Sequence, residues 1–363
     1  MDITGLIGLG VDQETRSLIQ SIQTGEITIA AGSASNTATI TAVQTRNAVC
    51  FFGGWRSADT SLATSEDYCR VSLTNSTTVT AQSSAANAGS TRIVRYTVVE
   101  FKPFAIRRIQ QGTITISGAN ATATATITAV NTARAFVVHQ GQNHTVNQSD
   151  FNYNQGRLDL TNTTTVTATK NATLNPSLVV GYVVVEFNAG IVKSIQQGTA
   201  NIAGSAATGD AAINAVVDGA ALLVNNGWNI GAFAANQGNR MPAIYRTSTT
   251  NVRAERGTSG TSVTVQYNFT VVEFEARWVK SRQAARTAIG SGASSANATL
   301  SPTIDTGKAL LSYLGHFSAD TASSVPDTDY PTAKINSTSQ ATFERGGTPA
   351  LALTPSWEVF EWL

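Results

Sequence analysis

The sequence predicts an all-β protein of four tandem antiparallel β-sandwich domains of about 87 residues, preceded by a short N-terminal arm. Two observations predict this fold class. The chain repeats itself four times, and self-similarity at a constant spacing indicates tandem structural units. Within each repeat, β-branched residues alternate with small or polar ones, and alternation with period two is typical of half-buried strands.

The clearest marker closes each repeat: a β-branched segment that ends in a glutamate and an aromatic residue. The four glutamates are 86, 87 and 88 residues apart. The glutamates are Glu100, Glu186, Glu273 and Glu361, and the aromatic residues after them are Phe101, Phe187, Phe274 and Trp362. This spacing divides the chain into an arm (1–20) and four repeats: repeat 1 (21–103), repeat 2 (104–189), repeat 3 (190–276) and repeat 4 (277–363).

Three further markers keep the same spacing. Each repeat opens on a short segment that contains glutamine, as in Ser21-Ile-Gln-Thr-Gly25. An apolar run in the middle of each repeat ends in a glycine: Gly54, Gly141, Gly227 and Gly315. A Thr-rich segment, Arg70–Thr80, returns as Arg157–Thr167, and its composition predicts one strand.

Each repeat is expected to contain about six strands, which suits a small antiparallel sandwich. The closing strand of repeat 1 indicates how the core is built. Tyr96, Val98 and Glu100 share one face of that strand, and its two apolar members are expected to fill the sandwich. The four closing aromatic residues are expected to pack against the linker or the next domain.

Composition and charge exclude several function classes. Charged residues make up only 13% of the chain, about half the usual share. The net charge is +1 and no run of Lys or Arg occurs, so a nucleic-acid partner is not expected. No apolar stretch reaches the ~18 residues of a membrane span. The apolar segment 6–11 follows Asp2 without any cation, so no signal peptide is predicted and synthesis in a cytoplasm is expected.

Both cysteines, Cys50 and Cys69, lie in repeat 1. A disulfide scaffold would place cysteines in every repeat, so the fold cannot depend on a disulfide. Two reduced, buried thiols are expected, and a bond that forms after release from the cell is the alternative.

The sequence predicts no catalytic residue, metal site or cofactor. His139 and His144 lie close together, but no acidic residue or cysteine stands at a metal-ligand spacing beside them. No Gly-x-Ser-x-Gly elbow occurs, and the glycine-rich segment 5–10 follows no strand. The four repeat glutamates are expected to be structural. Three of them precede a cation by seven residues, which predicts the pairs Glu100–Arg107, Glu186–Lys193 and Glu273–Lys280.

The segments that differ most between repeats follow the mid-repeat glycines. They span 55–68, 142–156, 228–242 and 316–331, and they open on Trp55, Gln142, Trp228 and His316. Further candidate contact residues within them are Tyr68, His144, Asp150 and Tyr153. Aromatic rings beside amide and carboxylate groups suit the binding of sugars, and loops on a rigid scaffold commonly carry binding surfaces. Ordinary solvent loops or subunit contacts are the alternative.

The Gln-x-Gly openings, the Asn-Ser-Thr-Thr-Val-Thr segment and the closing Val-Val-Glu-Phe resemble repeat domains of tailed-bacteriophage virion proteins. Unit length and strand order loosely resemble the H-type lectin sandwich. The resemblance implies a non-enzymatic component of a virion exterior, either a capsid decoration or a fibre-like appendage. It also implies other virion proteins as partners and a homo-oligomer, with a trimer as the first expectation. The N-terminal arm would attach the protein to the particle, and a first strand or a flexible tail is the alternative for this segment. The alternatives are an adhesin for a bacterial surface glycan and a glycan depolymerase.

Overall fold

The computed structural model describes residues 17–57, 68–83, 91–144, 155–171, 177–231, 241–258, 263–318 and 330–363. Most of the expected N-terminal arm, residues 1–16, lies outside these ranges. The first strand begins at Ile19, within the last residues assigned to this arm. The described residues form 24 strands and short 3-10 turns, with no α-helix.

Each repeat supplies six strands. Repeat 1 forms β1 (Ile19–Ile29), β2 (Ser35–Thr39), β3 (Ala48–Ser57), β4 (Arg70–Asn75), β5 (Thr78–Gln82) and β6 (Arg92–Phe101). Repeat 2 forms β7 (Ile106–Ile116), β8 (Thr122–Thr126), β9 (Ala135–His144), β10 (Arg157–Asn162), β11 (Thr165–Thr169) and β12 (Leu178–Phe187). Repeat 3 forms β13 (Val192–Ile202), β14 (Thr208–Ala212), β15 (Ala221–Ile230), β16 (Pro242–Ser248), β17 (Asn251–Arg256) and β18 (Val265–Phe274). Repeat 4 forms β19 (Val279–Arg286), β20 (Ser295–Thr299), β21 (Ala309–Ser318), β22 (Pro331–Ser337), β23 (Gln340–Arg345) and β24 (Leu353–Trp362).

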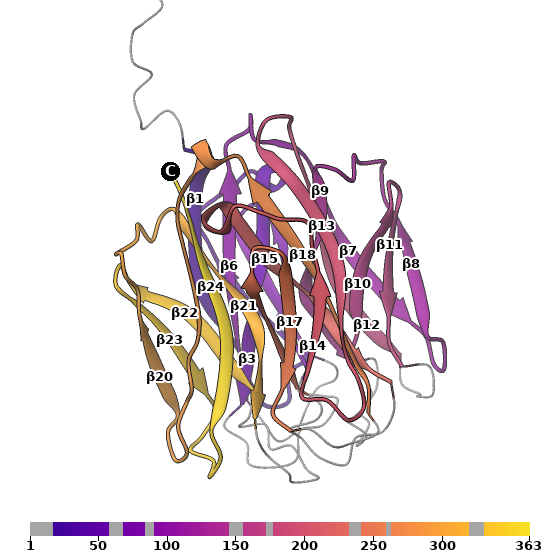
Figure 1. The fold of residues 1–363 in the computed structure, drawn as a ribbon, viewed down its shortest axis with the longest axis vertical. Coiled ribbons are helices and arrows are strands. Elements are labelled where there is room, and N and C mark those ends of the chain that lie inside the picture. Colours follow the sequence, from indigo (N-terminus) through magenta and orange to yellow (C-terminus); the bar gives the residue numbers. More distant parts are fainter. Residues whose placement is uncertain are drawn as a thin grey trace, which may run out of the picture.

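The expected fold class, four tandem β-sandwich domains, is wrong. The strands form four six-stranded antiparallel sheets arranged as a four-bladed β-propeller. Each sheet takes three strands from one repeat and three from the repeat before it. The sheet orders are β2-β5-β4-β9-β12-β7, β13-β18-β15-β10-β11-β8, β14-β17-β16-β21-β24-β19 and β1-β6-β3-β22-β23-β20. The last order joins repeat 4 to repeat 1 and closes the ring, so the first and last repeats lie side by side (Figure 1).

The physical reason for this correction lies in the strand edges. An isolated sandwich would leave backbone N–H and C=O groups unpaired along β3 and β4, and such edges bind other strands. Here every such edge pairs with the neighbouring repeat. We call these four joins seams. The pairs that form them are Arg70–Gly141, Arg157–Gly227, Ala243–Gly315 and Thr332–Gly54.

All four mid-repeat glycines therefore lie at a seam. Each has a positive φ, between 83° and 91°, which residues with a Cβ rarely adopt. A Cβ at any of them would also lie under 3.0 Å from a backbone carbonyl oxygen of the adjoining repeat. For Gly141 that oxygen belongs to Cys69, and for Gly54 it belongs to Pro331. The glycines are needed because the backbones of two repeats approach each other here.

The four closing aromatic residues meet at the centre of the ring. Each packs against the next in an edge-on arrangement, and the fourth returns to the first. The ring-centre distances are 5.4 Å for Phe101–Phe187, 5.4 Å for Phe187–Phe274, 5.9 Å for Phe274–Trp362 and 5.8 Å for Phe101–Trp362. All four are buried, and they belong to one hydrophobic cluster that contains residues of every repeat. The expected contact with the next domain is thus confirmed, and it extends to all four repeats.

Each repeat also has a hydrophobic cluster of its own. In repeat 1 it contains Tyr96 and Val98 of β6, as the alternation predicts, together with Val71 of β4 and Val79 of β5. The Thr-rich segment that was expected to be one strand is divided between β4 and β5. A turn at Asn75 separates them, because the Asn75 side chain accepts a hydrogen bond from the Thr77 N–H at 2.9 Å.

The repeat glutamates hold the backbone of their own repeat. Each is buried and accepts a hydrogen bond from a backbone N–H between the second and third strands: Gln44, Asn131, Val217 and Asp305. The expected ion pairs are shifted by one repeat. The observed pairs are Arg107–Glu186, Lys193–Glu273 and Lys280–Glu361, at 3.6, 2.9 and 2.8 Å. The shift arises because the cation begins the strand that pairs with the closing strand of the same repeat.

The glutamine of each opening segment has a structural role that the sequence did not reveal. Gln23 accepts a hydrogen bond from the Thr41 N–H at 2.7 Å and donates one to the Thr41 carbonyl at 2.9 Å. Gln110 does the same with Thr128, and Gln196 with Asn214. One amide side chain thereby ties the first strand of a repeat to the end of the second.

The seams differ in their polar contacts. At the seam between repeats 4 and 1, Arg56 and Arg95 each lie 3.1 Å from Glu344. At the seam between repeats 3 and 4, Arg282 lies 3.1 Å from Asp218. In the described residues the other two seams have no such ion pair, and arginine binds neutral partners there instead, as in Arg70–Asn143 at 2.7 Å. Such differences favour the correct neighbour over the others.

Replacement of a seam glycine should destabilise the ring. We expect Gly141→Ala to cost roughly 2–5 kcal/mol, because it combines an unfavourable positive φ with a clash against the Cys69 carbonyl. Chemical denaturation measures the change. Gly219→Ala is the matched control, since no atom lies within 4 Å of its added Cβ. Equal stability of the two variants would contradict the close approach.

The central aromatic cluster should also be sensitive to truncation. We expect Phe187→Ala to lower the free energy of unfolding by about 3–5 kcal/mol, because Phe187 is fully buried and contacts two other closing aromatic residues. Phe104, which is 46% exposed, supplies the control, and Phe104→Ala should cost less than ~1 kcal/mol. Thermal unfolding of both variants tests this expectation, and a small loss for Phe187→Ala would contradict it.

Candidate ligand-binding site

A cavity of about 120 Å³ lies on the axis of the ring, further along it than the closing aromatic residues, and residues of all four repeats line it. We call it the axial cavity. The seam glycines Gly54, Gly141, Gly227 and Gly315 stand at or beside its wall, and three of them line it directly. One water needs roughly 10–15 Å³ of such space. The axial cavity can therefore hold several waters or one small ring-shaped ligand.

Three tiers of equivalent residues form about half of the wall. The first tier stands two residues before the seam glycine: Phe52, His139, Asn225 and Tyr313. The second stands immediately after it: Trp55, Gln142, Trp228 and His316. The third tier lies on the other side of each seam. Its members stand two residues before the residue that pairs with the seam glycine, and they are Tyr68, Gln155, Met241 and Tyr330. In each tier the side chains differ greatly, although the backbone positions are equivalent.

Repeats 1 and 4 build an aromatic side of the cavity. Trp55 stacks on Tyr330 with ring centres 4.3 Å apart, and Tyr68 stands edge-on to both at 6.0 Å. On the repeat 4 side, the Tyr313 hydroxyl and His316 Nδ1 share a hydrogen bond of 2.5 Å. His316 Nε2 lies 3.0 Å from the sulfur of Met241. Aromatic faces with polar edges can hold an amphipathic ring.

Repeats 2 and 3 contribute apolar side chains and several neutral polar groups. Gln142 accepts a hydrogen bond from the Gly156 N–H at 2.8 Å, and Asn225 accepts one from the Gly227 N–H at 2.7 Å. The side chain of Gln155 donates to the hydroxyl of Tyr68. His139 Nδ1 accepts from the Gly141 N–H at 3.1 Å. These bonds hold the amides and the imidazole in defined orientations.

Burial lowers the pKa of His139 to about 4, and a partly compensating effect comes from the nearby Gly156 carbonyl. The imidazole is therefore neutral above pH ~5. Because Nδ1 is an acceptor, the proton of the neutral ring lies on Nε2. That Nε2 atom is buried and meets no partner with hydrogen-bond geometry.

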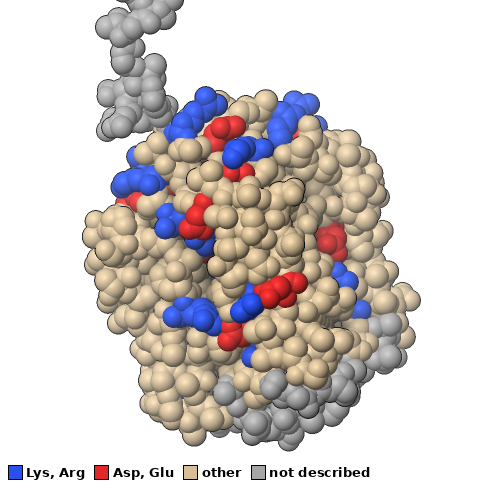
Figure 2. Space-filling model, in the orientation of Figure 1, with Lys and Arg blue, Asp and Glu red and all other residues tan. Residues whose placement is uncertain are grey.

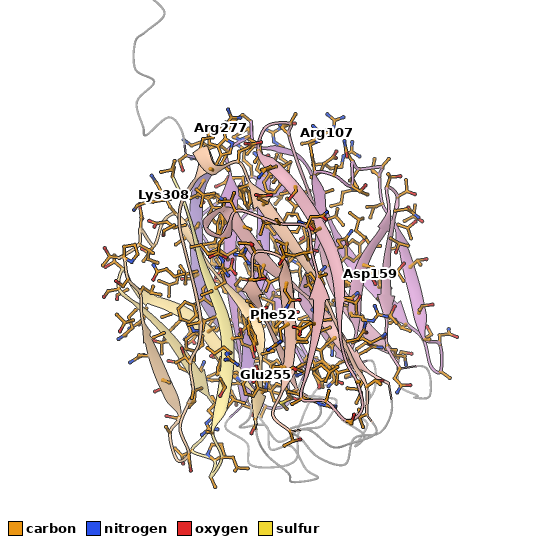
Figure 3. The ribbon with its side chains drawn as sticks, in the orientation of Figure 1. Phe52, Arg107, Asp159, Glu255, Arg277 and Lys308 are labelled. Carbon is orange, nitrogen blue, oxygen red and sulfur yellow. The ribbon has the colours of Figure 1, made fainter. Side chains whose placement is uncertain are left out.

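No Asp, Glu, Lys or Arg lies among the described residues that line the axial cavity. Charged groups lie elsewhere, as small mixed clusters on a largely neutral surface (Figure 2). Phe52 lies within the ring, whereas Arg107 and Arg277 lie at the upper end of the molecule (Figure 3). In the described part of the chain, no three His, Cys, Asp or Glu side chains gather as metal ligands.

The structure brings together most of the site residues that the sequence singled out. Trp55, Gln142, Trp228 and His316 form one tier of the cavity, and Tyr68 belongs to another. His144 stands outside the wall with its ring 5.3 Å from that of Tyr68. Asp150 and Tyr153 lie outside the described residues. Cys50 and Cys69 are buried and not joined by a disulfide.

Sequence reasoning missed the first tier, which consists of Phe52, His139, Asn225 and Tyr313. The third tier lies within the predicted segments, but its members Gln155, Met241 and Tyr330 were not singled out. A signal for them existed, because alignment of the repeats on the seam glycines places unlike residues at the same position. Their convergence could not be predicted, since it depends on closure of the ring.

Comparisons with protein-family models, with curated protein sequences and with solved structures match this chain to none of them. In the described part of the chain, no helix has the length and apolar character needed to cross a membrane.

The buried imidazole of His139 should make stability depend on pH. In an unfolded chain the histidine pKa is ~6.5, so the unfolded state takes up the proton first as the pH falls. The stability contributed by the neutral imidazole is present above pH ~6.5 and is lost between ~6.5 and about 4. Between pH 7 and pH 4.5 we expect a loss of roughly 2–3 kcal/mol from this group.

His139→Gln isolates this contribution from that of the carboxylates. Chemical denaturation of both proteins at the two pH values should show a smaller loss for the variant. Ring-proton NMR should place the His139 titration near pH 4 in the native protein. Identical pH profiles for the two proteins would show that the imidazole is not held neutral by burial.

Proposed function

We propose that this protein is a non-enzymatic binding protein that attaches to an uncharged glycan through the axial cavity. The carrying observation is the composition of the cavity wall: aromatic rings and neutral hydrogen-bonding groups, with no charged side chain among its described residues. A charged ligand placed there would lose its hydration without an opposite charge to compensate, which is strongly unfavourable. An uncharged ring with hydroxyl groups can stack on the aromatic side chains and form hydrogen bonds with the neutral polar groups of the wall.

The architecture supports binding as well. A closed ring holds the equivalent positions of the four repeats on a rigid backbone, and preorganised sites lose less conformational entropy on binding. Glycoside hydrolysis commonly uses a pair of carboxylates that flank the scissile bond. The described wall of the cavity supplies no such pair, which favours binding over the glycan depolymerase considered from the sequence.

We further propose that the protein acts on the exterior of a bacteriophage particle, as an adhesin or a capsid decoration. This part rests on the sequence resemblance alone. The partner virion proteins and the homo-oligomer, with a trimer as first expectation, stay predictions too. Immunogold labelling of intact particles tests the location: gold on the head favours a decoration, gold on the tail favours an adhesin, and unlabelled particles would contradict the proposal.

Glycan binding is tested with an array of neutral and charged bacterial polysaccharides. We expect binding to neutral members, and Trp228→Ala should weaken it at least tenfold, because part of the indole of Trp228 remains accessible in the cavity. Trp278→Ala is the matched control, since Trp278 lies in the linker before β19, beside Phe104. Its binding should match that of the unmodified protein.

Two outcomes would contradict this proposal. One is binding to acidic or basic polysaccharides alone. The other is equal affinity of Trp228→Ala and the unmodified protein for the neutral ligand. Circular dichroism of both variants verifies that the fold is retained.

A further inference from the structure

Three buried polar atoms in the wall of the axial cavity make no well-aligned hydrogen bond within the protein: His139 Nε2, Gln155 Oε1 and Tyr267 Oη. His139 Nε2 lies near the Gly156 carbonyl, but without good hydrogen-bond geometry. Tyr267 is fully buried, and Gln155 is 4% exposed. Buried polar groups without a partner are rare and destabilising, and they indicate a bound water, an ion or a ligand. That three of them line one cavity points to a common occupant.

The three atoms complement one another. His139 Nε2 carries the proton of the neutral imidazole and is a donor. The amide oxygen of Gln155 is an acceptor, since its nitrogen donates to Tyr68. The phenol of Tyr267 can donate and accept. Burial raises the pKa of Tyr267, so this phenol stays protonated. A ligand for this set must both donate and accept hydrogen bonds. Neighbouring hydroxyl groups on a sugar ring do both.

The two kinds of wall are unequally distributed around the ring. The three unpartnered atoms come from repeats 2 and 3, whereas the stacked rings of Trp55 and Tyr330 come from repeats 1 and 4. A ligand with one apolar face and one hydroxylated edge suits this distribution. Four equivalent ligands do not fit it, because no tier repeats its chemistry in all four repeats.

We propose that the axial cavity binds one uncharged hexose unit per chain and that His139, Gln155 and Tyr267 select it through its hydroxyl groups. This inference rests on the proposed function and names the part of the glycan that the cavity recognises. Tyr267 lies beneath the seam glycine Gly315, where a Cβ would stand 2.8 Å from its hydroxyl. The fold thus holds that hydroxyl in place without any side-chain partner.

Isothermal titration calorimetry of the full chain tests the inference. The probes are methyl glycosides of glucose, galactose, mannose and N-acetylglucosamine, with glucuronic acid and glucosamine as charged counterparts. We expect one site per chain, and a preference for one neutral hexoside over its epimers. We expect Tyr267→Phe to weaken that binding roughly 2–13-fold, the usual effect of one lost hydrogen bond.

Tyr182→Phe is the matched control. Tyr182 is also buried but lies in the hydrophobic cluster of repeat 2, outside the cavity wall. Its variant should bind like the unmodified protein. Tyr267→Phe should unfold at no lower temperature than the unmodified protein, because it removes a buried hydroxyl that has no partner.

The outcomes separate this inference from the proposed function. Four sites per chain, or unchanged affinity in Tyr267→Phe and His139→Gln, would overturn the inference. If Trp228→Ala still weakened glycan binding at least tenfold in that case, the proposed function would stand. Absence of binding to every neutral glycan and hexoside would overturn both.

Discussion

The close approach of two backbones at each seam is the constraint on which the rest of the structure depends. Strand pairing across a seam requires a residue without a Cβ, in a conformation with positive φ. Gly54, Gly141, Gly227 and Gly315 meet both requirements. Strand β22 of repeat 4 pairs with β3 of repeat 1, as the corresponding strands do at the other three seams. The ring therefore closes, and the edge of β3 is not left unpaired.

Closure of the ring separates structural from variable positions. One end of the axis is filled by Phe101, Phe187, Phe274 and Trp362, which are aromatic in every repeat and pack only against protein. Further along the axis, equivalent positions hold residues as different as Trp55 and Gln142. A backbone that is nearly the same in all repeats can tolerate such divergence. The variable wall is therefore where recognition can be specified without loss of the fold.

The buried polar groups of the fold and those of the axial cavity differ in how they are hydrogen-bonded. The buried repeat glutamates each accept a hydrogen bond from a backbone N–H group, and Gln23 binds both backbone groups of Thr41. Groups in the axial cavity are held in place but incompletely paired, as His139 and Tyr267 illustrate. Buried polar atoms without a partner also occur outside the cavity, as Glu186 Oε2 and Trp362 Nε1 show. Those of the cavity support a bound ligand because they line one space that is large enough to hold it.

The sequence by itself determined the number of repeats, the six strands expected in each, and the positions of the recurring glycines and closing aromatic residues, because period-two alternation and repeat spacing are local signals. It also singled out Trp55, Gln142, Trp228 and His316. Only the tertiary structure decided that β4 pairs with β9 rather than ending a separate sandwich. Strand edges pair through backbone groups that every residue carries, so the sequence contains no signal for the partner. The convergence of His139, Gln155 and Tyr267 on one cavity depends on that choice of partner, and it became visible only once the ring was closed.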